Sequence, residues 1–82
     1  MKEREDILTA IKEIMVDMFE MDEQAITMEA KLYEDLDFDS IDAVDMIVRL
    51  KEMTGKSIKA EDFKTARTIG DVVEAVYKML NS

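Results

Sequence analysis

The residues best suited to chemistry in this chain lie in one short acidic segment that contains a single serine. The segment reads Asp35-Leu36-Asp37-Phe38-Asp39-Ser40-Ile41-Asp42, and Ser40 stands where a loop meets the start of an amphipathic helix. A hydroxyl at such a junction is exposed and can be reached by another protein. Ser40 therefore either caps the helix or is a point of attachment.

The chain itself contains no group that would activate this serine. Its 82 residues include neither cysteine nor histidine. Disulfides, the common zinc sites and every Ser-His-Asp or Cys-His arrangement are therefore excluded. The base that activates Ser40 would have to come from a partner, and we expect the chain not to be an enzyme.

The aspartates before Ser40 also suggest a calcium loop, which the sequence does not support. Asp35, Asp37 and Asp39 would occupy its first, third and fifth positions. Ser40 then replaces the glycine of the sharp turn, and Met46 replaces the bidentate glutamate. We therefore predict no metal site.

The net charge restricts the possible partners. Twenty acidic residues against 11 basic ones give a formal charge of −9. This charge disfavours binding to nucleic acid and to anionic membrane surfaces, and it favours partner proteins with basic patches. The N-terminus is charged and no long apolar run follows, so we expect neither a signal peptide nor membrane insertion. We expect a cytoplasmic monomer with one domain over 1–82.

The apolar pattern predicts an all-α fold of three main helices, one short helix and a long first loop. The main helices are expected over about 3–19, 40–53 and 69–80, and the short one at 61–65, carrying Phe63. The first should bury Ile7, Leu8, Ile11, Ile14, Met15, Met18 and Phe19, and the last Ile69, Val72, Val73, Val76, Tyr77 and Leu80. The loop at 20–39 should be held to the core by Ile26, Leu32, Tyr33, Leu36 and Phe38.

Several residues are typical of helix ends. Asp39 with Asp42, and Thr68 with Asp71, have the spacing of capping boxes. Gly55 suits the left-handed position that ends the second helix. By propensity alone, Gly70 weakens the first turn of the last helix.

The second helix carries more apolar residues than one buried stripe needs. They are Ile41, Val44, Ile47, Val48 and Leu50. The helix is therefore either buried on two sides or keeps an apolar patch for a partner.

The segment from Glu34 to Asp42 resembles the modification site of acyl carrier proteins. That family usually shows an acidic residue, Leu, a small residue, then Asp-Ser-Leu and a further acid. The resemblance extends over nearly the whole chain, since the helices, the long first loop, the region of Ile58 and the start at Thr68-Ile69 fall at the expected spacing. It implies a small four-helix bundle.

The resemblance also implies a function. Ser40 would carry covalent 4′-phosphopantetheine, transferred from coenzyme A by a phosphopantetheinyl transferase, which makes the chain a phosphoprotein. The thiol of this arm would hold acyl intermediates as thioesters, in fatty acid biosynthesis and lipid metabolism or in a specialised, polyketide-like pathway. The partners would be acyltransferases, ketosynthases and other acyl-processing enzymes with basic patches.

Two sets of residues acquire expected roles from this resemblance. The recognition surface on the second helix would contain Asp39, Ile41, Asp42, Asp45, Val48 and Glu52. An interior pocket for the acyl chain would be lined by Val44, Ile47, Ile58, Phe63 and Val72, although the same side chains also suit a plain core.

The chain departs from the family pattern in ways that concern its partners. Asp37 stands where Gly is frequent, Ile41 replaces Leu, and no Pro follows Ile58. Arg49 and Lys51 place positive charge on the second half of the recognition helix. By charge complementarity they should select a partner surface that is not uniformly basic.

Two other interpretations remain open at this point. One is a carrier that is loaded with amino acids or D-alanine by an adenylating enzyme. The other is an unmodified acidic adaptor domain in which Ser40 is only a cap, so that Ser40→Ala would cost about 0.5–2 kcal/mol of stability and leave function intact.

Overall fold

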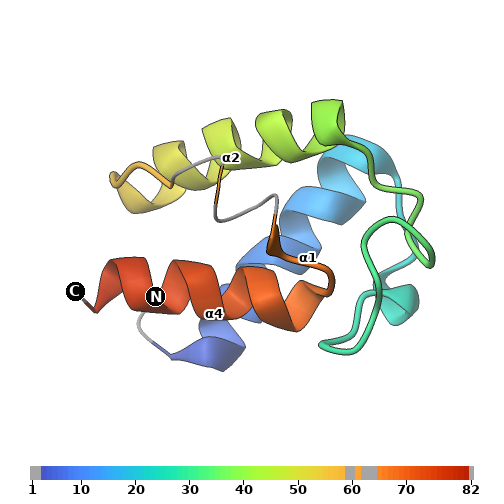
Figure 1. Ribbon diagram of the computed structural model, residues 1–82, viewed down its shortest axis with the longest axis horizontal. Helices are drawn as coiled ribbons and strands as arrows, with labels where there is room; N and C mark the ends of the chain where they lie inside the picture. Colours follow the sequence, from blue (N-terminus) through green and yellow to red (C-terminus); the bar gives the residue numbers. More distant parts are fainter. Residues whose placement is uncertain (1–2, 59–60, 62–64, 82) are drawn as a thin grey trace.

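The computed structural model describes residues 3–58, 61 and 65–81, and its regular structure is helical (Figure 1). The elements are α1 (Arg4–Phe19), a 3-10 turn η1 (Glu23–Ala25), α2 (Ser40–Thr54) and α4 (Ile69–Leu80). The expected all-α class is confirmed, and each main helix ends within one residue of its predicted bounds. The 3-10 turn η1, which lies inside the long loop, was not predicted from the sequence.

The core lies where α1, α2 and α4 meet. In Figure 1, α1 runs obliquely between α2 and α4. The buried residues of α1 and α4 form the apolar stripes expected from their spacing, but Met18 is exposed. Four further residues of the expected stripes are only partly buried against the core: Leu8, Phe19, Tyr77 and Leu80. The stripes consist of Ile7, Ala10, Ile11, Ile14 and Met15 on α1, and Ile69, Val72, Val73 and Val76 on α4.

The second helix turns only one of its apolar faces to the core. Met46 and Leu50 are fully buried, whereas Ile41, Val44 and Val48 are 72%, 57% and 53% exposed. Of the two sequence alternatives, the structure thus has the one in which α2 keeps an apolar patch on its surface. Met46, which was not among the apolar residues expected on this helix, provides the inward contact because it lies one helical turn before Leu50.

The long first loop is pinned to the core, as predicted, with one exception. Ile26, Leu32, Leu36 and Phe38 are buried, but Tyr33 is 51% exposed. The prediction for Tyr33 is wrong because Leu32 takes the inward position in this turn and the next side chain points outward. A phenol is also less costly to expose than an aliphatic side chain, because its hydroxyl can bond to water.

Backbone hydrogen bonds join this loop to the start of α4. The Leu32 amide donates to the carbonyl of Arg67 at 2.9 Å, and the Ile69 amide donates to the carbonyl of Ala30 at 3.0 Å. Lys31 and Thr68 form an isolated antiparallel bridge between these bonds. These bonds pair polar backbone groups of the loop where it packs against the start of α4.

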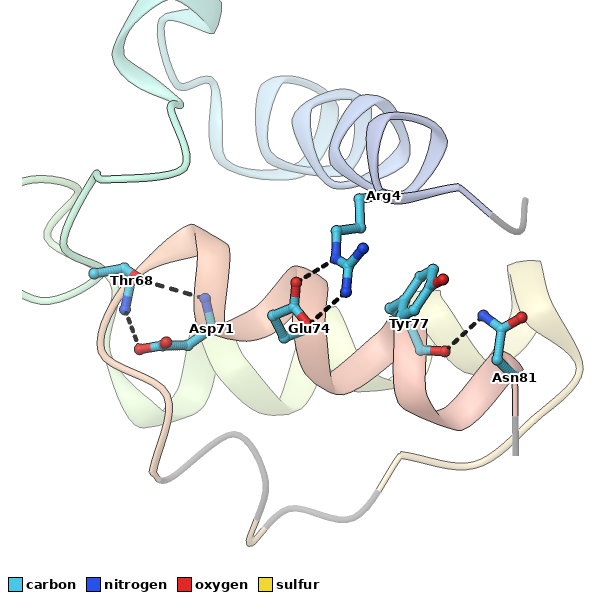
Figure 2. Close-up of polar contacts among 6 residues, drawn as sticks. All are labelled: Arg4, Thr68, Asp71, Glu74, Tyr77 and Asn81. Atoms are coloured by element: carbon cyan, nitrogen blue, oxygen red, sulfur yellow. Dashed lines mark hydrogen bonds and ion pairs between the residues drawn. The ribbon is translucent and has the colours of Figure 1, made fainter.

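The capping box of α4 is confirmed (Figure 2). The Asp71 amide donates to the Thr68 hydroxyl at 3.2 Å, and the Thr68 amide donates to the Asp71 carboxylate at 3.2 Å. The same carboxylate accepts the Arg67 amide at 2.9 Å. These bonds, led by the one from Arg67, lower the pKa of Asp71 below its ordinary value.

A polar contact ties the first turn of α1 to the middle of α4. The Arg4 guanidinium makes a two-pronged ion pair with Glu74, in which Nη2 lies 3.3 Å from Oε2, and it sits 4.1 Å above the ring of Tyr77 (Figure 2). The hydrogen bond from Arg4 lowers the pKa of Glu74. Because both side chains are about half exposed, this ion pair adds little to the free energy of unfolding.

Most of the expected short helix, Phe63 included, lies outside the described residues. Its two ends, Glu61 and Thr65, have helical backbone, and the Thr65 hydroxyl donates to the carbonyl of Glu61 at 3.4 Å. Among the helices that the structure describes, none combines the length and the apolar character needed to cross a membrane.

Gly70→Ala should destabilise the protein by about 1–2 kcal/mol, although propensity alone predicts a gain. A Cβ at this position would lie 2.9 Å from the carbonyl oxygen of Met28, which already accepts the Gly70 amide. Urea unfolding measures the change. A gain in stability would mean that α4 and the long loop do not approach each other this closely.

Asp71→Ala should lower the free energy of unfolding most at neutral pH. The pKa of Asp71 is lowered in the folded state, so its contribution is full above the ordinary value of 3.8 and is lost as the pH falls through the folded-state pKa. Urea unfolding across this range should show the gap to the parent chain closing in acid. The control is Asp45→Ala, because Asp45 has no hydrogen bond or ion pair within the described residues. An equal, pH-independent loss in both variants would contradict the capping box.

Candidate functional site

The position of the candidate site is fixed by a buried aromatic side chain just before it. Phe38 is fully enclosed, and its ring packs edge-on against Phe19 at the end of α1, with centroids 5.4 Å apart and planes at 78°. The Phe38 amide donates to the carbonyl of Leu32 at 2.8 Å. The segment that enters α2 is therefore held by both a side chain and a backbone contact.

Asp39 forms the cap of α2, as predicted. One carboxylate oxygen accepts the amides of Ile41 and Asp42, both at 3.0 Å, and the Asp39 amide donates to the Asp42 carboxylate at 3.2 Å. The capping box is complete and α2 begins at Ser40. Both carboxylates next to Ser40 are thus occupied by backbone amides, and their charges lie at the positive end of the helix dipole.

The loop that leads to this cap contains a residue in the left-handed region. Asp37 has a φ of 54°, a conformation that glycine adopts freely and that aspartate tolerates better than most other residues. Glycine, which the resemblance leads one to expect at this position, would adopt this conformation without strain. The far end of α2 also has a residue in the left-handed region. Gly55 has a φ of 74°, and its amide donates to the carbonyl of Lys51 at 2.8 Å.

The residues expected to meet partners share the outer side of α2. Asp39, Ile41, Asp45, Val48 and Glu52 are exposed, and Asp42 is half-buried. Exposed Val44 continues the apolar surface between Ile41 and Val48. Apolar and acidic side chains therefore lie together on one solvent-facing strip of the helix.

The residues expected to line an acyl pocket are only partly brought together. Ile47 and Ile58 line one open groove of about 590 Å³ beside the second half of α2. Val72 is buried in the core, Val44 faces solvent, and Phe63 lies outside the described residues. The pocket as a whole stays a prediction.

The two cations on α2 differ in their surroundings. Arg49 forms an ion pair with Asp17 of α1, with Nη2 and Oδ2 3.5 Å apart. Lys51 is exposed and lines the groove next to Ile47 and Val48. The pairing of Asp17 with Arg49 could not be predicted from the sequence, because residues so far apart along the chain are brought together only by the packing of α1 on α2.

The acidic residues of this region do not form a metal centre. Among the residues that the structure describes, no three carboxylates come together in a way that could hold a metal ion. Ser40 is the first residue of α2, and its neighbours Asp39 and Ile41 are exposed.

Comparison with known proteins identifies the family of the chain. Residues 9–76 match the family model described as the phosphopantetheine attachment site. The chain is 51% identical to "Acyl carrier protein 2" of Ralstonia nicotianae over 92% of its own length and 93% of that protein. It is 35% identical to the acyl carrier protein of Thermotoga maritima over 98% and 99% of the two chains. The acyl carrier protein of Rubrobacter xylanophilus is 39% identical over 90% of this chain and 91% of its own.

A small helical chain with a matched attachment region is a phosphopantetheine-dependent carrier protein. The chain belongs to the acyl carrier protein family. Its prosthetic group is 4′-phosphopantetheine. The resemblance drawn from the acidic serine segment is thereby confirmed.

Asp39→Ala should destabilise the protein by about 0.5–2 kcal/mol, because the amides of Ile41 and Asp42 lose their acceptor. Asp39→Ser should keep most of the stability, since a serine oxygen also caps a helix. Urea unfolding of the two variants beside the parent chain makes the comparison. Equal losses in both would show that Asp39 acts through its charge and not as a cap.

Proposed function

We propose that Ser40 is the residue that receives 4′-phosphopantetheine, and that the chain then carries acyl groups between enzymes. When bound, this group supplies a terminal thiol on which acyl groups are held as thioesters. The observation that carries the proposal is the cap. Asp39 satisfies the first amides of α2, so the helix has no need of Ser40 as a cap.

The surroundings of Ser40 suit attachment of a phosphate ester. Ser40 is the first residue of α2, and its neighbours Asp39 and Ile41 are exposed, so a transferase can approach. A phosphate at a helix N-terminus lies at the positive end of the dipole. In the transfer, the Ser40 oxygen would displace adenosine bisphosphate from the phosphorus that bears pantetheine, and the hydroxyl proton would pass to a base of the transferase.

The outer side of α2 supports the proposed partners. The strip of Ile41, Val44 and Val48 offers apolar contact beside the acidic Asp42, Asp45 and Glu52. A phosphopantetheinyl transferase, acyltransferases and ketosynthases with basic patches would bind such a strip. Exposed charge pairs raise the rate of encounter more than they prolong the complex, which suits a carrier that must leave each enzyme.

The proposed cargo is an acyl intermediate of fatty acid biosynthesis or of a specialised, polyketide-like pathway. Carriers named as acyl carrier proteins cover nearly the whole chain, which supports acyl cargo over an amino acid. Loading of the modified chain by a malonyltransferase, compared with loading by an adenylating enzyme, tests this choice. Aminoacylation without malonyl loading would contradict it.

Incubation with coenzyme A and a broad-specificity phosphopantetheinyl transferase should add one phosphopantetheine group to the chain. Intact-mass measurement should show the gain in the parent chain and in Ser57→Ala, and no gain in Ser40→Ala. Ser57 is the matched control because it is another exposed serine and lies shortly after the end of α2. Circular dichroism confirms that each variant is folded. A gain in Ser40→Ala, or none in the folded parent chain, would overturn the proposal.

A further inference from the structure

The second half of α2 borders the open groove that contains Ile47 and Ile58, two of the residues expected to line the acyl pocket. Its walls come from Ile47 and Val48 on the helix and from Gly55, Ser57 and Ile58 after it, and it encloses about 590 Å³. Lys51 and Glu52 stand at the same groove. Ile58 is buried and Val48 is 53% exposed, so the groove joins the core to the open apolar strip of α2.

Lys51 brings a positive charge to this groove. It is exposed, and within residues 3–58, 61 and 65–81 its ammonium has no ion pair. Arg49 is in a different situation, because Asp17 already compensates its charge. Of the two cations on α2, Lys51 is therefore the one without an ion pair to any residue that the structure describes, and the exposed acids Asp45 and Glu52 lie on the same helix.

We propose that Lys51 and this groove form a second contact region at the C-terminal half of α2, which receives a partner segment with a carboxylate beside an apolar side chain. The apolar side chain lies against Val48 and Ile58, and the carboxylate lies at the ammonium of Lys51. The inference deepens the proposed carrier function, since it specifies which of the acyl-processing enzymes the chain accepts.

Charge complementarity decides the kind of partner. A uniformly basic surface docked along α2 would meet the acids around Ser40 and would then place a cation opposite Lys51. Juxtaposed like charges disfavour a complex even where single attractive pairs add little. The matching enzyme thus has a basic patch near the start of α2 and an acidic group at its end. Lys51 selects between these enzymes and takes no part in the chemistry.

The test uses a malonyltransferase with a basic docking patch as the probe, and the unmodified chain as its ligand. The Kd should fall by about threefold to tenfold for Lys51→Glu, and by less for Lys51→Gln. The control is Lys12→Glu, which changes the net charge equally but lies on α1 beside a different groove, with Thr9 and Val16. Circular dichroism checks that each variant is folded.

A second set of measurements tests the attractive half of the inference. Each basic residue of the enzyme's patch is changed to Glu in turn. One of these enzymes should bind the parent chain about threefold to tenfold more tightly than the unchanged enzyme does, and Lys51→Glu should abolish that gain.

The inference is overturned if Lys51→Glu binds the enzyme no more tightly than Lys12→Glu does. It is also overturned if no altered enzyme shows tighter binding to the parent chain that Lys51→Glu abolishes. Because Kd is measured on the unmodified chain, failure of Ser40 to accept phosphopantetheine would not affect this result. Normal modification of Ser40 together with an inert Lys51 would in turn leave the proposed function intact.

Discussion

The burial of Phe38 against Phe19 is the contact on which the candidate site depends. It fixes the loop immediately before α2, and the adjacent Asp39 can then close the capping box with Asp42. The aromatic contact fixes the position at which the helix begins, and the cap provides acceptors for its first backbone amides. As a result the helix starts at Ser40, between the exposed residues Asp39 and Ile41. Asp39 therefore has the structural role of the cap, and the chemical role is the one proposed for its neighbour Ser40.

The second helix is divided in a similar way between core and surface. Met46 and Leu50 hold it to the bundle, and this single stripe leaves Ile41, Val44 and Val48 in solvent. Exposed apolar side chains lower the solubility of a small protein unless charge surrounds them, and the formal charge of −9 supplies that protection. The same acids that keep the apolar strip in solution give it the charge by which basic partners would find it.

The sequence was sufficient for features that depend on local chemistry. Helix periodicity, the capping boxes at Asp39 and Thr68, and the left-handed Gly55 all follow from nearby residues, and the structure contains them. Features that depend on packing could not be predicted. The outward turn of Tyr33 and the close approach of Gly70 to Met28 arise only when the long loop meets α4. The family could be predicted because the signal of the acidic serine segment is local, whereas the expected acyl pocket, which is assembled from distant segments, stays a prediction.

The measurement that tests the central claim most directly is the location of phosphopantetheine in the chain purified from the cells that make it. Proteolysis and tandem mass spectrometry would assign the group to a single residue. The account predicts that it lies on Ser40, in the peptide that also contains the Asp39 cap. A chain that carries no such group in these cells, or carries it on another residue, would contradict the division of roles between Asp39 and Ser40.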